Sequence, residues 1–553
     1  MSMARAVETI LEIDGREIKD FISLKLSQGI YAHHEFRLEC FAEALGKDMH
    51  SVFNESADLM GASIKVQVTS VQEQSSLSFS GVITEVAVGS ENGHPGMIVI
   101  SGASPTILLD QGPQRRSWIR ESVKSMVKDV LKQYYADWLT YTIKPVSDDT
   151  IYYEVQYNET AWQFITRLAG QYGEWLYYDG QKLVIGTPKD PAINLTYGIQ
   201  LSRFVQRVEL RSGKLQVKAH NYVKNEKFES LIENIANHTG HVDVGAKVLA
   251  KGEELFGAVT KDWYSQNVKD KEKLDEVMNN KVAIQHSDIV QMTGYSDLPG
   301  LRPAGVIHVN REEAASDYRI ISLVHYLDGT GNYRNEFMAI PASVKKAPAK
   351  PVKAPWCAGQ TAIVVDNYDK ANLGRVQVRF HWMGEKEVSP FLRMVTPYTG
   401  NGNGLYMKPE IGAEVMVNFE EGNATRPYIT GVMNNGSATT LHEKEGNDIK
   451  AIQTRNGIKI IMNDGNGSLS IADKNGNKLE LDGEGVIRID AKKVLELKCG
   501  ESMIALNKDG TINISGQVVE IDTKGEMRVI SDDAISIRSA EKVAVVGAMI
   551  TLN

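Results

Sequence analysis

Two histidines, His238 and His241, form an H-x-x-H pair. This spacing can hold a metal ion when a helix or turn brings a third ligand close. No H-E-x-x-H sequence and no neighbouring cysteine supplies that ligand. The three cysteines, Cys40, Cys357 and Cys499, are too far apart for a Cys-spaced zinc site or a disulfide framework. We therefore expect the histidines to be polar loop or surface residues, and we expect no metal site.

Three acidic residues stand in turn-like segments. Asp366 and Asp369 share one of them, and Asp464 opens an Asp-Gly-Asn-Gly sequence in another. Neither segment fits the calcium-loop pattern, so we expect turn formers. The sequence also lacks G-x-S-x-G, P-loop and kinase signatures. A carboxylate pair for glycoside cleavage has no fixed sequence spacing, because the two groups need only meet in space. We expect no catalytic residue and no cofactor.

The composition favours a folded protein made in a reducing compartment. Hydrophobic residues make up 42% and charged residues 24%, both ordinary globular values. The formal net charge of −9 argues against broad attraction to nucleic acid or to an anionic membrane. The chain shows neither a secretory signal nor an apolar run of about 18 residues. We expect cytoplasmic localisation on assembly and no signal peptide.

The elements that would position any site fall into several units. A length of 553 residues suggests three to five of them. The stretch from Pro341 to Pro355 holds four prolines and four lysines and predicts an extended linker. Upstream, alternating strand patterns are interrupted by two helical patterns, Trp118 to Tyr135 and Thr160 to Gly173, the second with a capping box. The first 340 residues therefore predict an α+β unit with strands predominating.

A short all-β unit follows the linker. Around residues 376–382 and 414–419, apolar and polar residues alternate as in strands with one wet face, and Gly-rich turns separate the strands. The pattern suits a small closed barrel, a fold that often binds nucleic acid. Residues 356–436 carry seven basic and eight acidic side chains, which is not a nucleic-acid footprint. We expect the candidate contact residues to pack the barrel against a neighbour or against the carboxy-terminal segment instead: Arg375, Arg379, Arg393, Tyr398 and Tyr406.

The last stretch repeats an apolar pair at i and i+2, with steps of 8, 9, 8, 7, 8, 8, 8 and 7 residues. A fixed repeat length with an i, i+2 apolar pair in each repeat predicts short strands joined by corners in a solenoid or prism. Weaker pairs upstream are Ile458/Ile460, Leu469/Ile471 and Leu479/Leu481. The nine regular pairs are Ile487/Ile489, Leu495/Leu497, Ile504/Leu506, Ile512/Ile514, Val519/Ile521, Met527/Val529, Ile535/Ile537, Val543/Val545 and Ile550/Leu552.

One narrow strip of this kind offers little interior and leaves strand edges open. Three chains wound about one axis would solve both problems, with the apolar pairs facing the axis and the charged residues facing outward. Residues 450–553 carry 14 basic and 15 acidic side chains, which suits a nearly neutral outer shell. A single-chain β-solenoid remains the alternative. We predict a shared trimer axis lined by the apolar pairs from Ile487 to Val545.

Several stretches resemble the VgrG spike proteins of type VI secretion systems and, more broadly, the hub and puncturing spike of contractile phage tails. The resemblance is strongest from 356 to 436 and covers nearly the whole chain. One departure is at the entry to the needle, where many relatives have Gly-His and this chain has Gly457 followed by Ile458. The stretches that carry it are 374–382, 393–397, 409–419 and 426–431, with 102–106, 157–173 and 318–325 upstream.

The resemblance implies a mainly β protein with an α+β hub, an OB-fold barrel and a carboxy-terminal trimeric β-prism, an intertwined β-helix. The implied hub spans 1–345, with two β-barrels at roughly 1–100 and 175–345 around a helical segment at 101–175. Beyond it come a linker at 346–355, the OB-fold domain at 356–440, a neck at 441–485 and a needle at 486–553. On this plan we expect neither an added effector domain nor an inserted lysozyme-like unit.

The implied function is mechanical: the trimer caps an inner tube within a baseplate, and contraction drives it through a target membrane and into the target cell. The implied partners are two further copies, an inner-tube (Hcp-like) ring, baseplate proteins, effector cargo and a PAAR-repeat tip protein, with no nucleic acid. A phage tail or extracellular injection particle, a cell-wall hydrolase and a receptor-binding β-prism adhesin remain alternatives. The expected tip contacts are Val545, Met549, Ile550, Leu552 and Asn553.

Overall fold

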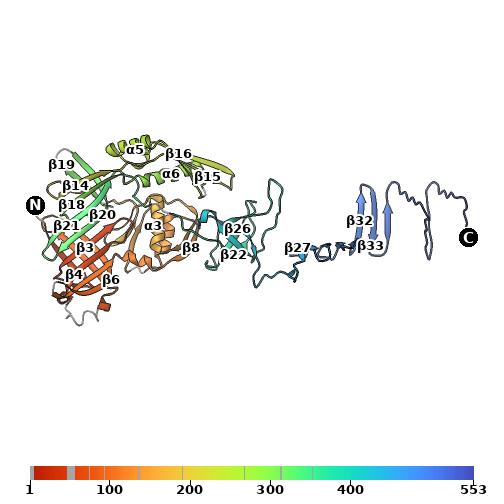
Figure 1. The fold of residues 1–553 in the computed structure, drawn as a ribbon, viewed down its shortest axis with the longest axis horizontal. Helices are drawn as coiled ribbons and strands as arrows, with labels where there is room; N and C mark the ends of the chain where they lie inside the picture. The colour runs from red at the N-terminus through yellow and green to blue at the C-terminus, as the bar shows by residue number, and fades with distance from the viewer. Residues whose placement is uncertain are drawn as a thin grey trace. The chain divides into compact units, whose positions relative to one another are not determined.

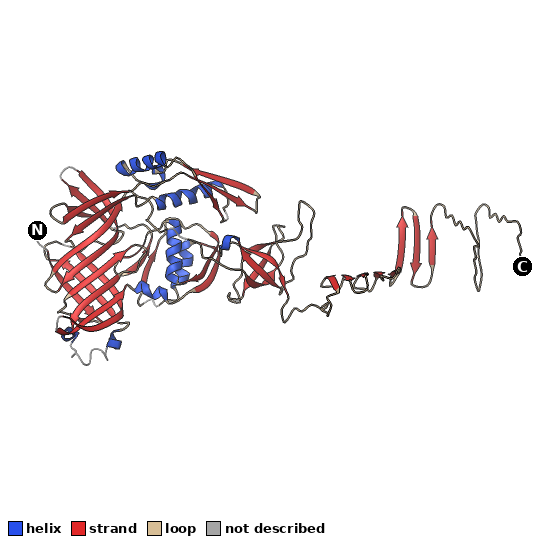
Figure 2. Ribbon diagram, viewed as in Figure 1, coloured by secondary structure: helices blue, strands red, loops and turns tan. Residues whose placement is uncertain are grey.

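The structure is a computed structural model, and its chain forms two compact units, residues 1–435 and 436–553. Helix is confined to the first unit among the described residues, as Figures 1 and 2 show. None of the described helices is long and apolar enough to cross a membrane. The structure describes residues 5–45, 56–73, 75–91, 94–134, 137–189, 191–266, 268–311, 314–350 and 353–552.

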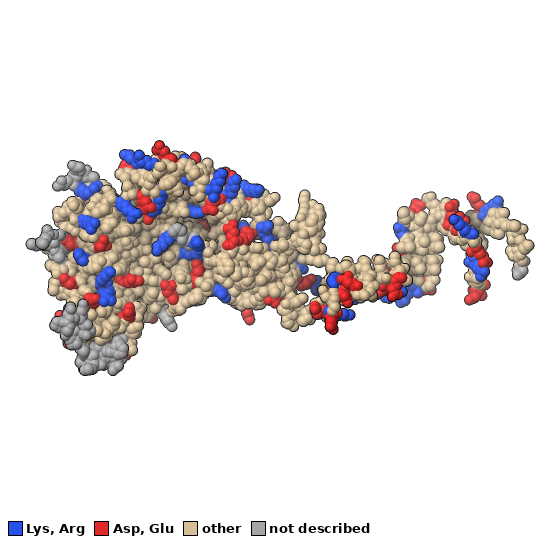
Figure 3. Space-filling view, in the orientation of Figure 1, with Lys and Arg blue, Asp and Glu red and all other residues tan. Residues whose placement is uncertain are grey.

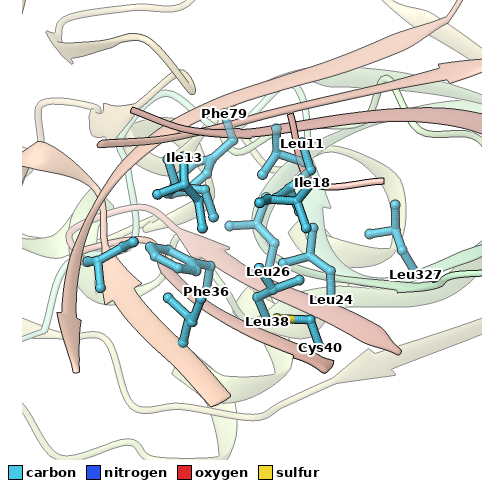
Figure 4. Packing of buried hydrophobic residues seen from close by; sticks show 14 of the residues in the cluster. Leu11, Ile13, Ile18, Leu24, Leu26, Phe36, Leu38, Cys40, Phe79 and Leu327 are labelled. Carbon is cyan, nitrogen blue, oxygen red and sulfur yellow. The ribbon is translucent and has the colours of Figure 1, made fainter. Parts of the chain in front are cut away.

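Eight antiparallel strands close a ring in the first unit, because β20 pairs with β3 on one side and with β21 on the other. Alternate residues point inward, as the two-residue period of a strand requires. Leu24 and Leu26 of β3 meet Phe36 and Leu38 of β4 in this core (Figure 4). The ring order is β20 (Ala314–Asp328), β3 (Ser23–Gly29), β4 (Glu35–Phe41), β7 (His94–Ala103), β6 (Ser76–Glu91), β5 (Ser63–Ser70), β1 (Arg5–Ile13) and β21 (Asn332–Pro341), with β2 (Arg16–Glu17) beside β1.

A second group of strands shares β20 and β21 with this ring. Its core is separate and includes Met292, Leu323 and Phe337. The predicted limits of the two barrels stay a prediction. The strand pairing shows that strands from residues 314–341 complete the core formed by the first hundred residues. The order of this group is β13 (Ile193–Thr196), β19 (Val306–Arg311), β20, β21, β18 (Val290–Ser296) and β14 (Leu201–Val208).

The insert after the first seven strands carries the two predicted helical patterns. The helix expected from Trp118 is wrong at its start, because Trp118 and Ile119 lie in β8 (Gln114–Glu121) and pair with β10 (Ile151–Glu159). Ser122 caps α2 (Val123–Leu131), and its side chain accepts the Ser125 N–H at 3.3 Å. An apolar stripe read at helical spacing does not show where a strand gives way to a helix.

The second helical pattern is confirmed as α3 (Ala161–Tyr172). The Thr160 hydroxyl accepts the Gln163 N–H at 3.1 Å, and the Gln163 side chain accepts the Thr160 N–H at 3.0 Å. Gly173 ends the helix at φ +63°, a conformation that favours glycine. Around α3 lie η3 (Pro105–Asp110), β9 (Thr140–Ile143), β11 (Leu176–Tyr178) and β12 (Lys182–Ile185).

A second insert lies within residues 215–285 and was not anticipated from the sequence. It packs helices against a three-stranded sheet, with Leu274 and Met278 fully buried between them. The apolar residues of α6 do not follow one clean stripe, which explains why its pattern gave no helix signal. The elements are β15 (Leu215–Asn221), β16 (Glu226–Ile232), α4 (Ala236–Thr239), α5 (Asp243–Leu255), β17 (Thr260–Tyr264) and α6 (Lys271–Gln285).

The start of the proline-rich segment is part of the first unit rather than a free tether. Val344 and Ala347 are buried with Trp175 and Tyr177. The Ala347 N–H donates to the Gly173 carbonyl at 3.4 Å. The segment has no regular secondary structure where it is described, in keeping with its prolines.

The small closed barrel predicted after the linker is confirmed. Val376, Val378 and Phe380 fill its core with Val415 and Val417, as their alternation predicts. Among the described residues, eight short strands make up the regular structure of the second unit. The barrel strands are β22 (Gln360–Asp366), β23 (Val376–Phe380), β24 (Phe391–Met394), β25 (Glu414–Phe419) and β26 (Pro427–Met433).

Candidate functional site

Strand pairing in the second unit lines up its apolar residues in two columns on one face. In the first five strands, Ile460 pairs with Ile471, and Met462 pairs with Leu469. The same two columns continue to Ile489 and Ile487. Register of this kind is fixed because a one-residue slip would turn every apolar side chain to the other face. These strands are β27 (Ile449–Gln453), β28 (Lys459–Asn463), β29 (Ser468–Ala472), β30 (Lys478–Leu481) and β31 (Ile487–Asp490).

The columns recur in the next three strands. Leu497, Ile504 and Ile514 form one row of direct partners across the sheet. Leu495, Leu506 and Ile512 form the other. These strands are β32 (Val494–Cys499), β33 (Ser502–Asn507) and β34 (Ile512–Ser515). The predicted i, i+2 pairs therefore share one face wherever strands are described.

This apolar face is uncovered in the single chain. Ile512 of β34 is 64% exposed, although it is a large aliphatic residue. The strands predicted for the pairs from Val519 to Leu552 are not found, since residues 516–552 are described without strands, and Ile537 in that stretch is 73% exposed. Leu495 alone of the predicted axis residues is half-buried rather than exposed. A contiguous exposed apolar surface is typical of an interaction site. The exposed set is Ile487, Ile489, Leu497, Ile504, Leu506, Ile512, Ile514, Val519, Ile521, Met527, Val529, Ile535, Ile537, Val543 and Val545.

The expected tip residues are also exposed. Met549 is 87% exposed and Leu552 is 90% exposed. Val545 and Ile550 belong to the same exposed stretch, and Asn553 lies outside the described residues. Charged side chains of both signs are interspersed along the second unit on the face drawn in Figure 3.

Upstream, the register corrects one of the weaker pairs. Ile458 lies before β28 and belongs to neither column. Within β28 the two column residues are Ile460 and Met462. Ile452 of β27 also joins the column through its pairing with Ile460. The Ile460/Met462 pair was present in the sequence at i, i+2 spacing, but Asn-Gly turns of different length hid the period there, and Ile452 has no apolar residue two positions away.

The histidine and aspartate candidates do not form a site. His241 is buried, and its Nε2 donates to the His286 carbonyl at 2.8 Å. Asp369 accepts the Ala371 N–H at 3.0 Å and so shapes its turn, and Asp464 forms an ion pair with Lys450 at 3.0 Å. Within the described ranges, no group of three His, Cys, Asp or Glu residues could hold a metal ion.

The barrel residues considered for nucleic acid are mostly engaged within the chain. Arg375 forms an ion pair with Asp369 at 2.8 Å, which holds the pKa of that carboxyl well below its usual range. Arg379 donates to the Glu385 carbonyl at 2.6 Å. Arg393 lies over the Tyr222 ring at 4.8 Å. The two tyrosines, Tyr398 and Tyr406, are exposed.

A hydrogen-bonded series of polar side chains crosses the interior of the first barrel. The sequence did not predict this series. The His34 Nε2 lies 3.2 Å from the Gly29 carbonyl, which can only accept, so this nitrogen is the donor. Its Nδ1 therefore accepts from the Gln28 amide at 3.1 Å. The Gln28 oxygen then accepts from His325 Nε2 at 2.9 Å, and His325 Nδ1 accepts from the Tyr333 hydroxyl at 2.5 Å. Both imidazoles are neutral in this arrangement.

This arrangement predicts that acid weakens the fold. Burial lowers the pKa of His34 and of His325 to about 3, against about 6.5 in an unfolded chain. Between those values the unfolded chain binds more protons, so stability is complete above pH ~6.5 and falls as pH drops toward 3. Each histidine contributes a slope of up to about 1.4 kcal/mol per pH unit in the free energy of unfolding. The free energy of unfolding, measured with urea between pH 7.5 and 5.5, should change less per pH unit in the His325→Gln variant than in the parent.

The matched control for this slope is the variant His220→Gln, whose half-buried imidazole contacts Asn225 at 3.3 Å. It should retain the parent pH dependence. Identical slopes for the parent and the His325→Gln variant would contradict a neutral buried pair.

Comparison with known proteins identifies the family to which this architecture belongs. The model of the phage tail baseplate hub (GPD) family matches residues 29–330, more than half of the chain. The chain belongs to the phage tail baseplate hub family. In this hub protein, a second match, to the type VI secretion system/phage-baseplate injector OB domain, covers residues 360–433. Those limits coincide with the start of β22 and the end of β26.

Individual relatives of this hub protein are spike proteins. VgrG1a, a type VI secretion system spike protein of Pseudomonas aeruginosa, is 22% identical over 78% of this chain and 80% of its own length. VgrG1b of the same organism is 22% identical over 69% of this chain, which spans about half (54%) of that relative. VgrG in a Francisella PdpA-VgrG complex shares the fold with a TM-score of 0.59 at 10% identity, covering 89% of this chain and 88% of that one.

Proposed function

We propose that three copies of this hub-family chain form the hub and spike of a contractile injection apparatus. The observation that carries the proposal is the pair of apolar columns in residues 449–515, aligned by strand register and left uncovered in one chain. If three copies turned these faces inward, the apolar side chains would be removed from water, and their burial would contribute roughly 25 cal/mol per Å² of apolar surface. The same arrangement would seal strand edges that one chain leaves open.

The proposed role is mechanical rather than catalytic. The hub would cap an inner-tube ring within a baseplate, and contraction would drive the spike and its effector cargo through a target membrane. The spike and hub relatives support this role. A type VI apparatus is favoured by the names of those relatives, and a phage tail or extracellular particle would use the same parts. The chain would assemble in the cytoplasm and leave the cell when the machine fires.

The mass of the assembled protein in solution tests the trimer. Three copies of the 61.2 kDa chain give 183.6 kDa. Light scattering coupled to size exclusion separates this value from that of a monomer. A folded 61.2 kDa species with an ordered carboxy-terminal segment would contradict the proposal, because no partner would then be needed to cover the apolar face.

Removal of the apolar end tests the proposed tip. Deleting residues 550–553 removes Ile550 and Leu552, which are 51% and 90% exposed. We expect co-purification of a PAAR-repeat protein to fall at least about tenfold, because the cap would lose its apolar contact surface. The control is a Lys542→Ser variant, which changes a charged residue away from the end. Unchanged recovery of the PAAR-repeat protein after the deletion would contradict a tip formed by these residues.

A further inference from the structure

A cavity of about 350 Å³ lies where the two groups of strands in the hub separate. One edge of β21 pairs with β18 up to Asn335 and with β1 at Tyr333. The change of partner leaves Arg334 between two neighbouring strands that diverge. The volume is within the range of small-ligand sites, about 300–1,000 Å³. Its lining comes from β14, β18, the residue after β18, β20, β21 and the turn before β14.

The cavity has aromatic walls and acidic groups. Its tyrosines are Tyr295 and Tyr326, both half-buried, and the fully buried Tyr333. Asp297 and Glu336 contribute two carboxylates to the lining, which contains one cation, Arg334, with Arg203 bonded to the Tyr295 hydroxyl beside it. A cationic ligand would meet both carboxylates and the faces of tyrosine rings.

Asn335 adds an oriented acceptor to this lining. Its side chain is 1% exposed, and its Nδ2 lies 2.9 Å from the Leu298 carbonyl, which can only accept. The second Nδ2 hydrogen points to the Tyr333 hydroxyl at 3.0 Å. That hydroxyl donates to His325, so it accepts from Asn335. Both amide hydrogens are used, and Oδ1 is buried without a hydrogen-bond partner. A buried carbonyl oxygen in this state costs free energy until a donor reaches it.

Neighbouring contacts show that these rings accept guanidinium groups. The Arg334 guanidinium lies 4.9 Å from the Tyr326 ring centre, and Arg203 lies 5.0 Å from that of Tyr295. Arg203 also donates to the Tyr295 hydroxyl at 3.0 Å. We propose that the cavity is a binding site for the guanidinium group of an arginine side chain presented by another protein chain. The two carboxylates would pair with the cation, and its N–H groups would supply donors to the acceptors of the lining.

The site lies wholly within the hub, so its test does not depend on the proposed spike function. Calorimetric titration of the full-length protein with Nα-acetyl-arginine amide should show saturable binding. The citrulline analogue has nearly the same shape without the charge and should bind at least about tenfold more weakly. Glu336→Gln and Asp297→Asn should each weaken arginine binding by about fivefold or more.

The matched control is Glu8→Gln, which removes the same charge from an exposed position on β1 outside the cavity. It should bind the arginine derivative as the parent does, and thermal melting should show that all three variants fold. Equal binding of the citrulline analogue would overturn the proposal, as would unchanged affinity in both carboxylate variants. Absence of saturable binding up to about 50 mM, or preferential binding of a neutral sugar, would overturn it as well.

Discussion

Ile504→Asp will make the carboxy-terminal segment of the assembled protein sensitive to proteases and will lower its mass from 183.6 kDa toward the 61.2 kDa of one chain. Ile504 lies on the central strand β33, between its direct partners Leu497 and Ile514. In the proposed trimer three carboxylates would be buried close together on one axis. An unpaired buried charge costs about 3–5 kcal/mol, which corresponds to a more than hundredfold rise in the open population. Trypsin cleavage rates after residue 486, measured beside light scattering, check this result.

Lys498→Asp is the matched control for that substitution. It introduces the same residue on β32, but on the face opposite Leu497. Lys498 is exposed, and the proposed trimer keeps that face in water. The control should retain the parent mass and protease resistance. If Ile504→Asp behaves like Lys498→Asp, the apolar columns do not face a shared axis.

Local patterns predicted the elements whose burial follows a simple period. Alternation identified the strands around Val376 and Val415, because each has one buried face in the closed barrel. The capping box at Thr160 and the glycine at 173 identified both ends of α3, because caps act within one helical turn. The carboxy-terminal i, i+2 pattern identified the strands up to Ser515, and the strands that it predicted beyond that residue are not found in residues 516–552.

Local sequence periods did not predict the features that depend on contacts between distant residues. Strand β20 completes the first barrel from about 300 positions away, as the pairing of His325 with Leu26 shows. The buried chain from His34 to Asn335 exists only because that strand joins the ring. Neither histidine has a spacing that marks it. The cavity beside Asn335 likewise arises where a strand changes partner, which no local sequence period encodes.

Arg167→Met will lower the stability of the hub by about 3–5 kcal/mol, because it removes the cation from a buried cluster. Arg167 is 6% exposed. Its Nε donates to Glu159 at 2.7 Å, and its Nη1 donates to Glu154 at 3.0 Å. Burial lowers the pKa of Arg167, but the two carboxylates outweigh this and raise it overall. The matched control is Arg115→Met, an exposed arginine on β8 that lies over the Tyr157 ring at 4.9 Å.

Urea unfolding of the hub signal will distinguish the two arginines. In the Arg167→Met variant, Glu154 remains 3% exposed with no cation beside it, so it must either stay charged at a high cost or take up a proton. Protonation would make the loss of stability smaller at pH 5.5 than at pH 7.5, whereas a packing defect would cost the same at both. Arg115→Met should change stability by less than about 1 kcal/mol, since its contact is exposed. A loss for Arg167→Met that is no larger, or one independent of pH, would show that the carboxylates are not held by this cation.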